Sequence, residues 1–138
     1  AKVNVKAVEF IKNSELIIIA PGNPISSIGP IISLPAIRKE LQSKKDNVIA
    51  ISPLIGNRAV SGPASKYMQI MGIESSPFGI ASYYRDIASN LIISELDKEY
   101  ESRIRTLGID IYKTNIVMEQ SQDEIILSNY ILNIVNKA

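Results

Sequence analysis

Two short aliphatic runs, each ending at a proline, constrain the fold of this chain most. Residues 16–20 (LIIIA) lead into Pro21-Gly22-Asn23-Pro24, and residues 48–52 (VIAIS) lead into Pro53. The first run shows no polar alternation, so we expect both of its faces to be covered, as in a parallel sheet. Both runs are typical of buried strands that end in a tight turn.

Helical and strand patterns alternate along the rest of the chain. We expect helices over residues 4–11, 28–34, 36–44, 64–71, 78–88, 97–107 and 123–136, and further strands over residues 91–94 and 109–112. Residues 54–62 read as a loop, and residues 115–119 fit no pattern. In the last helix we expect Ile126, Ile131, Ile134 and Val135 to be available for the core. The alternation predicts an α/β fold of three α/β/α layers with a mostly parallel, Rossmann-like sheet. Four strands make a small sheet, which we expect to be part of a larger one.

Composition excludes several classes of function. The 138 residues predict one domain, and a hydrophobic content of 46% is enough for a core. A net charge of +1 gives no electrostatic reason to expect nucleic acid or an anionic membrane. The chain has no Cys and no His, which removes disulfides, Ser-His-Asp triads and most zinc sites. No apolar run approaches a membrane span and no signal peptide is visible, so we expect a cytoplasmic protein.

The turn after the first strand is the first candidate site. Ligands bind outside the carboxyl ends of strands in open α/β sheets, and helix-start N–H groups favour anions. The residues that we expect to contact a ligand here are Gly22, Asn23, Pro24, Ser26, Ser27 and Ile28. The alternative, an ordinary turn in which the serines only cap a helix, stays open.

The loop after the second strand should reach the same edge of the sheet. Its candidate binding residues are Ser52, Pro53, Gly56, Gly62 and, one turn into the next helix, Lys66. The loop resembles a phosphate cradle in outline only, because Pro63 stands where a Walker loop requires Lys. The alternative for Lys66 and for Arg58 is solvated surface charge.

Two further groups allow a structural explanation. The alternating acids Glu95, Asp97, Glu99 and Glu101 have the ligand type for Mg²⁺, although such a run is more often the charged start of a surface helix. Tyr83 and Tyr84 share an apolar stripe with Ile80, which favours a place in the core over a stacking platform for a base.

Three blocks resemble the 2-phospho-L-lactate transferase (CofD-like) family. Residues 21–31 resemble its P-x-N-P-x-x-S-I-x-P-I signature, residues 51–68 its S-P-I-x-G-G-x-x-x-x-G-P-A-x-K-M segment, and residues 71–84 its M-G-x-x-x-S-x-x-G-V-A-x-x-Y segment. The chain departs at Asn57, where the family usually has Gly, and at Tyr67, after which Met68 comes one position late. If position 57 needs a positive φ, Asn is the least costly replacement.

The resemblance implies a transferase. Such enzymes move a phospholactyl-type group from a guanosine-diphosphate-activated donor to the deazaflavin FO, release GMP, form the unglutamylated coenzyme F(420), and use Mg²⁺. The family's N-terminal half, with its G-G-T-G-G loop and the acidic residues expected to hold Mg²⁺, has no counterpart here. We therefore expect residues 1–138 to be the C-terminal portion of such a domain, inactive alone, with the missing N-terminal half as its partner. The catalytic residues, the metal ligands and the oligomeric state, a homodimer included, stay open.

Two other functions remain as alternatives. A non-catalytic sugar-nucleotide-binding relative, of the gluconeogenesis-factor type, shares the first signature but carries a C-N-x-M-T-Q segment where this chain has Ser52-Pro53 and Gly62-Pro63-Ala64. The second block therefore favours the transferase. An α/β scaffold that only mediates assembly is the other alternative.

Overall fold

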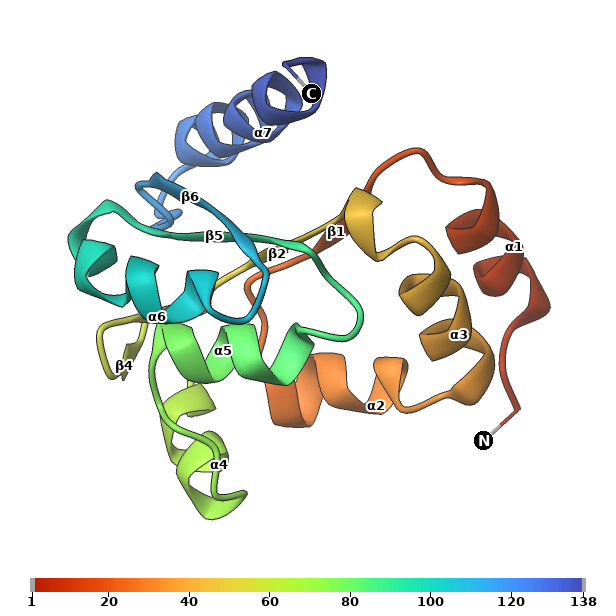
Figure 1. Cartoon of the computed structure of the whole chain (residues 1–138), viewed down its shortest axis with the longest axis horizontal. Helices are drawn as coiled ribbons and strands as arrows, with labels where there is room; N and C mark the ends of the chain where they lie inside the picture. The colour runs from red at the N-terminus through yellow and green to blue at the C-terminus, as the bar shows by residue number, and fades with distance from the viewer. Residues whose placement is uncertain (1, 138) are drawn as a thin grey trace.

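A four-stranded parallel sheet forms the centre of the computed structural model, which describes residues 2–137 (Figure 1). Its strands are β1 (Ile17–Ile19), β2 (Val48–Ile51), β5 (Asn90–Ser94) and β6 (Asp110–Thr114), in the order β1-β2-β5-β6. Ile18 lies opposite Ile49 between β1 and β2, and Ala50 lies opposite Leu91 between β2 and β5. The predicted parallel α/β fold is confirmed.

The helices that connect the strands cover one face of this sheet (Figure 1). They are α2 (Gly29–Ile32) and α3 (Pro35–Ser43) between β1 and β2, α4 (Ala64–Ile70) and α5 (Pro77–Tyr84) between β2 and β5, and α6 (Glu101–Arg105) between β5 and β6. The first helix, α1 (Val5–Asn13), packs against α3. Because right-handed crossovers in one direction place their helices on one face, the sequential strand order accounts for this layer.

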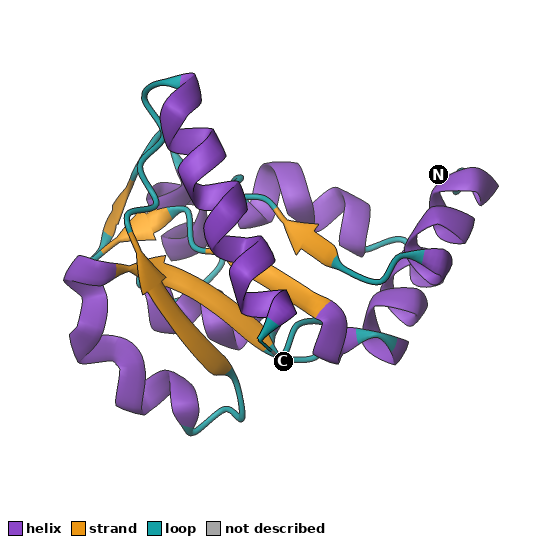
Figure 2. Ribbon diagram, turned by 90° about the horizontal axis from the view of Figure 1, so that it is seen from above, coloured by secondary structure: helices purple, strands orange, loops and turns teal. Residues whose placement is uncertain are grey.

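A single helix, α7 (Ser121–Asn136), covers the other face (Figure 2). Leu127 and Ile131, one helical turn apart, pack against Ile49, Ile51 and Ile92 of the sheet. Three layers result, but the α7 layer is narrow. Within residues 2–137, the structure has no helix that is long and apolar enough to cross a membrane.

Burial on the α7 side differs from the prediction at three positions. Ile18, the central residue of β1, is 47% exposed, so β1 is not covered on both faces. Ile126 and Val135 are also exposed, because only the stripe through Leu127 and Ile131 faces the sheet. The predicted burial of Ile131 is confirmed, and Ile134 packs at the edge of the same cluster.

Several connections differ from the prediction in their local structure. The expected loop at residues 54–62 contains a hairpin of β3 (Leu54–Ile55) and β4 (Arg58–Ala59). The helix expected over residues 97–107 is a 3₁₀ segment, η3 (Glu95–Tyr100), followed by the short α6, and a second 3₁₀ turn, η2 (Lys45–Asn47), precedes β2.

Helix α5 fixes the two tyrosines in the predicted structural role. Ser76 caps it by accepting the N–H of Gly79 at 3.1 Å. Tyr84 is 2% exposed and packs edge-on against Tyr83, with 5.2 Å between ring centroids. Burial raises the pKa of the Tyr84 hydroxyl.

Candidate functional site

Asn23 organises the turn at the carboxyl end of β1. Its side-chain oxygen accepts the N–H groups of Ile25 at 2.9 Å and Ser26 at 3.2 Å, and its carbonyl accepts those of Ser27 and Ile28 at 3.0 Å each. The chain therefore winds into a π-helical turn, η1 (Pro24–Ile28), which continues as α2. The helix expected over residues 28–34 is present as α2, preceded by η1, and the alternative in which the serines cap it is wrong, because Asn23 is the cap and Pro24 is the first residue of η1.

The other end of the Asn23 side chain has no partner. Its amide nitrogen, Nδ2, is buried and makes no hydrogen bond within the described residues. The orientation of the amide follows from its oxygen, which already accepts two backbone N–H groups. An unpaired buried donor costs about 1–3 kcal/mol, so an acceptor supplied from elsewhere would stabilise this turn. Asn23 already occupies the N–H groups at the start of this helix, so these groups are not free to bind an anion.

The remaining predicted residues of this turn have two kinds of environment. Ser26 and Ser27 are exposed on η1. Pro24 is buried, and Ile28 is half-buried and folds over Gly22, where an added Cβ would lie 3.4 Å from Cδ1 of Ile28. Pro24, Ile28 and Gly22 therefore shape the turn, while the serines face solvent.

Ser52 and Pro53 begin the hairpin at the end of β2. The Ser52 side chain is fully buried, and its hydroxyl donates to the carbonyl of Leu54 at 3.0 Å and accepts its N–H at 3.1 Å. Gly56 takes a φ of 57°, as a tight hairpin turn requires. Among the residues described, every positive φ belongs to a glycine, so Asn57 does not replace Gly for the reason that we expected.

A buried carboxylate holds this hairpin in place. Asp97 is 2% exposed, and its Oδ1 accepts the N–H of Gly56 at 2.7 Å, whereas its Oδ2 is buried without a partner. Burial raises the pKa of Asp97, the Gly56 N–H opposes the rise, and the nearby Glu99 adds to it. Asp97 belongs to the acidic run identified in the sequence, but its contact with the hairpin was not predicted.

The acidic run does not form a magnesium site. Glu101 pairs with Arg105 and with Lys113, and burial separates Asp97 from the exposed Glu95 and Glu99. Across residues 2–137, no three His, Cys, Asp or Glu side chains gather in a way that could hold a metal ion. Mg²⁺ is usually held by one or two carboxylates together with substrate phosphates and water, so this run does not supply a complete site by itself.

Gly62, Arg58 and Lys66 are exposed. Lys66 lies on α4, which packs against η1, so its helix is next to the Asn23 turn. In the described part of the chain, neither cation forms an ion pair within 4.0 Å. Their surface positions agree with the solvated alternative and leave both charges available to an anion.

A cavity of about 210 Å³ joins the two predicted blocks. It is lined by Pro21 from the first block, by Val60 and Ser61 from the second, and by residues 116–119. Residues 116–119 were not predicted to contribute. The sequence could have predicted this contribution, because in a parallel sheet the segment that follows β6 lies at the same carboxyl end as the turns after β1 and β2.

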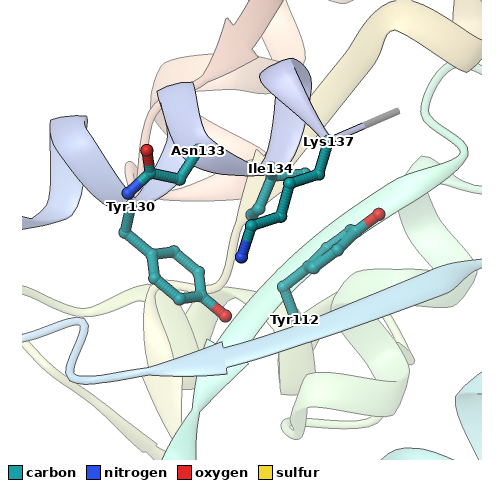
Figure 3. Close-up of a pocket in the computed structure, with 5 residues that line it drawn as sticks. All are labelled: Tyr112, Tyr130, Asn133, Ile134 and Lys137. Carbon is teal, nitrogen blue, oxygen red and sulfur yellow. The ribbon is translucent and has the colours of Figure 1, made fainter.

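A second cavity, of about 370 Å³, lies between β6 and α7 (Figure 3). Tyr112, Tyr130 and Lys137 point into it, and the Tyr130 hydroxyl donates to the carbonyl of Lys113 at 3.0 Å. A neighbouring cavity shares Tyr112 and extends to Asn47 and Asn90, at the amino ends of β2 and β5. This region is therefore separate from the candidate site.

The parallel sheet, with two signature turns at the carboxyl ends of adjacent strands, defines a Rossmann-like α/β protein. The chain matches the family model "2-phospho-L-lactate transferase CofD" over residues 1–131, and it belongs to this family. It is similar to the 2-phospho-L-lactate transferases of Methanocaldococcus jannaschii (46% identity over 132 residues), Methanosarcina mazei (43% over 122) and Methanopyrus kandleri (33% over 131).

These alignments cover 96%, 88% and 95% of this chain, but 41%, 40% and 41% of the respective relatives. The chain thus spans about two fifths of the length of these relatives. The resemblance in the sequence is confirmed at the level of the family.

Proposed function

We propose that this chain is part of a transferase that moves a phospholactyl-type group from a guanosine-diphosphate-activated donor to the deazaflavin FO and releases GMP. The main support is the unpaired Asn23 donor at the carboxyl end of β1, within the residues that match the family signature. The names of the relatives, which are 2-phospho-L-lactate transferases, support the transferred group. The activity belongs to the whole polypeptide, of which residues 1–138 supply one wall of the site.

The proposed reaction suits the residues of this chain. The terminal ribityl hydroxyl of FO attacks a phosphorus of the diphosphate, a new P–O bond forms, and the bond to GMP breaks while the hydroxyl proton passes to solvent. Phosphoryl-type transfer depends mainly on positioning and on charge neutralisation, so a chain without His can support it.

In this proposal each block has a distinct task. The Asn23 amide donates to a phosphate oxygen of the donor, and the Lys66 ammonium neutralises phosphate charge. Asp97 positions the hairpin that follows β2. Mg²⁺, when bound, would neutralise further charge, and most of its ligands would come from substrate phosphates, water or the part of the polypeptide outside residues 2–137.

GMP release provides the test. The complete polypeptide, incubated with FO, the guanosine-diphosphate-linked donor and Mg²⁺, should release GMP and form the deazaflavin product, as measured by chromatography and mass spectrometry. Lys66→Ala should lower donor turnover about 30-fold, as expected from losing about 2 kcal/mol of a charge-assisted phosphate contact. Lys98→Ala, at an exposed position on η3, is the matched control and should have no effect.

Two results would overturn the proposal. One is the absence of GMP release by a folded polypeptide that contains both halves. The other is tight binding of a UDP-sugar without affinity for FO, which would favour a sugar-nucleotide-binding regulator.

A further inference from the structure

We propose that Ser65 and Ser75 are positioning residues for Lys66. Their hydroxyl groups form a clasp that ties helix α4 to the tip of the β3–β4 hairpin, and this tie determines where the Lys66 ammonium can reach. This role rests on the proposed function, in which Lys66 contacts a phosphate group of the donor. The family segments that residues 51–68 and 71–84 resemble leave both serine positions open, so the resemblance assigns them no role.

The clasp consists of two hydroxyl groups and one backbone carbonyl. The Ser65 hydroxyl lies 2.9 Å from the Asn57 carbonyl oxygen and 2.6 Å from the Ser75 hydroxyl. The Ser75 hydroxyl lies 3.2 Å from the same carbonyl oxygen. Two hydroxyl protons serve two of these three contacts, and the two shortest distances assign them: Ser75 donates to Ser65, and Ser65 donates to Asn57. Hydrogen bonds in such a chain polarise and strengthen one another, so Ser65 is the central link.

The hairpin holds the Asn57 end of the clasp in place. Asp97 accepts the N–H of the neighbouring Gly56 at 2.7 Å. At the base of the hairpin, the Ser52 hydroxyl binds both backbone groups of Leu54. The Gly56 N–H and the Asn57 carbonyl are therefore both bound to side chains outside the hairpin, and the tip cannot shift without breaking one of these contacts.

Helices α5 and α6 hold the Ser75 end of the clasp in place. The next residue, Ser76, caps α5 and donates to a Glu74 carboxylate oxygen at 2.6 Å. Glu74 also accepts two hydrogen bonds from Arg103 of α6, at 3.1 and 2.9 Å. Ser75 lies between these two fixed residues, so its hydroxyl is a firm attachment point for α4.

Helix α4 has few constraints of its own. It has seven residues, and no side chain caps its first turn. Its buried residues, Ala64 and Met68, lie one turn apart and form a single stripe against the core. A helix this short and without a cap is marginal by itself. The clasp at Ser65 adds a polar tie within the first turn, beside the stripe that packs against the core.

Lys66 directly follows Ser65 and depends on this tie. Its side chain is exposed and forms no ion pair within 4.0 Å with any residue from 2 to 137. A lysine is a point charge on a flexible stem, so the position of its backbone decides which space the ammonium can reach. Because α4 packs against η1, the clasp sets the place of Lys66 relative to the Asn23 turn.

A double-mutant cycle tests whether Ser65 acts through Lys66. Calorimetric titration of the complete polypeptide with GDP gives the affinity. Ser65→Ala should weaken GDP binding about fivefold, as expected when one long side chain must be ordered on binding. In a Lys66→Ala background the same change should have an effect of less than about 1.5-fold, because the residue that it positions is gone. In a Lys98→Ala background it should keep its full effect, because Lys98 is an exposed residue of η3.

Single variants test whether the hydroxyl groups are responsible. Ser65→Thr keeps the hydroxyl and should bind GDP within about 1.5-fold of the wild type. Ser75→Ala removes one link but leaves the bond from Ser65 to Asn57, so it should weaken binding about threefold. Ser89→Ala is the matched control, since it removes a serine hydroxyl that donates to Asp46 at 2.8 Å just before β5, and it should not change the affinity.

Several results would overturn this role of the two serines. Equal effects of Ser65→Ala with and without Lys66 would show that Ser65 only stabilises the fold. Wild-type affinity in Ser65→Ala, or Ser65→Thr as weak as Ser65→Ala, would also exclude the clasp. GMP release by the wild type is measured separately and reports on the proposed function. Release together with equal effects on GDP binding would overturn only the role of the serines, whereas coupled effects without release would support this role and count against the proposed function.

Discussion

Replacing Asn23 with Ser separates the two roles of this side chain. The Asn23 oxygen caps η1, and its nitrogen is a buried donor without a partner. Ser is about as good an N-cap as Asn, but it has no group in the position of Nδ2. Ala removes both functions. The pair Asn23→Ser and Asn23→Ala therefore distinguishes a helix cap from a ligand contact.

The expected magnitudes follow from these contacts. Both variants remove the unpaired donor, and only Asn23→Ala also removes the cap. Asn23→Ala should therefore be less stable than Asn23→Ser by about 1 kcal/mol, within the usual range of about 0.5–2 kcal/mol for a lost cap. Asn23→Ser should be at least as stable as the wild type, because an unpaired buried donor costs about 1–3 kcal/mol. A hydrogen bond from Nδ2 to a phosphate oxygen is charge-assisted and is worth about 1.5–3 kcal/mol, so its loss should weaken nucleotide binding about 10- to 150-fold. Because the donor is already buried, the bond requires little further dehydration of the protein, which favours the upper part of this range.

Two measurements check these values. Urea unfolding of the 138-residue chain gives the change in stability, and calorimetric titration of the complete polypeptide with GDP gives the change in affinity. Asn129→Ser, at an exposed position on α7, is the control and should alter neither quantity.

Two outcomes would refute the reasoning. If Asn23→Ser binds GDP within about twofold of the wild type, then Nδ2 is not a ligand contact. If Asn23→Ser is as unstable as Asn23→Ala, then the turn needs the complete amide and the two roles cannot be separated.

Three further predictions concern stability. Burial raises the pKa of Asp97 above the reference value of 3.8, so between the unfolded-state and folded-state pKa values the folded protein keeps this proton while the unfolded protein loses it. The free energy of unfolding of the wild type therefore falls as the pH rises between these two pKa values. Asp97→Asn can still accept the Gly56 N–H but has no proton to lose, so its free energy of unfolding in urea should not show this fall. Its stability relative to the wild type should therefore rise between about pH 3 and pH 7, and the same pH dependence in both proteins would contradict the assignment. Gly79→Ala should lower the free energy of unfolding by about 3 kcal/mol, as measured by thermal unfolding, because the added Cβ would lie 1.8 Å from the Glu74 carbonyl oxygen. A loss below about 1 kcal/mol would mean that the start of α5 shifts easily to make room for the methyl group. Ser27→Ala removes an exposed hydroxyl that does not cap η1, so it should change the free energy of unfolding by less than about 0.5 kcal/mol, and a larger loss in urea unfolding would show that Ser27 is a cap.

The sheet could be predicted because its signals are local. Each strand is a short apolar run next to a turn or a helical pattern, and this alternation requires parallel pairing. Coverage of β1 was predicted wrongly for a physical reason. All three residues of β1 are isoleucines, but within residues 2–137 helix α7 packs against residues of β2 and β5 and leaves Ile18 of β1 47% exposed.

The sequence predicted the turn after β1 but not its internal contacts. Asn23, Ser26 and Ser27 are all residue types that cap helices, so composition alone could not choose among them. Pro24 gave a usable signal, because proline favours the first helical position and thereby points to the preceding residue as the cap. The contact of Asp97 with Gly56 joins residues 41 positions apart, and no local pattern encodes such a pairing.

Two of the buried polar atoms without partners follow the carboxyl ends of strands of the sheet. Three buried side-chain atoms in the described residues lack a hydrogen-bond partner: Asn23 Nδ2, Tyr84 Oη and Asp97 Oδ2. The Tyr84 hydroxyl lies in the core, but Asn23 and Asp97 follow the carboxyl ends of β1 and β5. Since buried polar groups are nearly always paired, these two exceptions lie where a further hydrogen bond would contribute most, at the edge of the sheet where open α/β proteins bind their ligands.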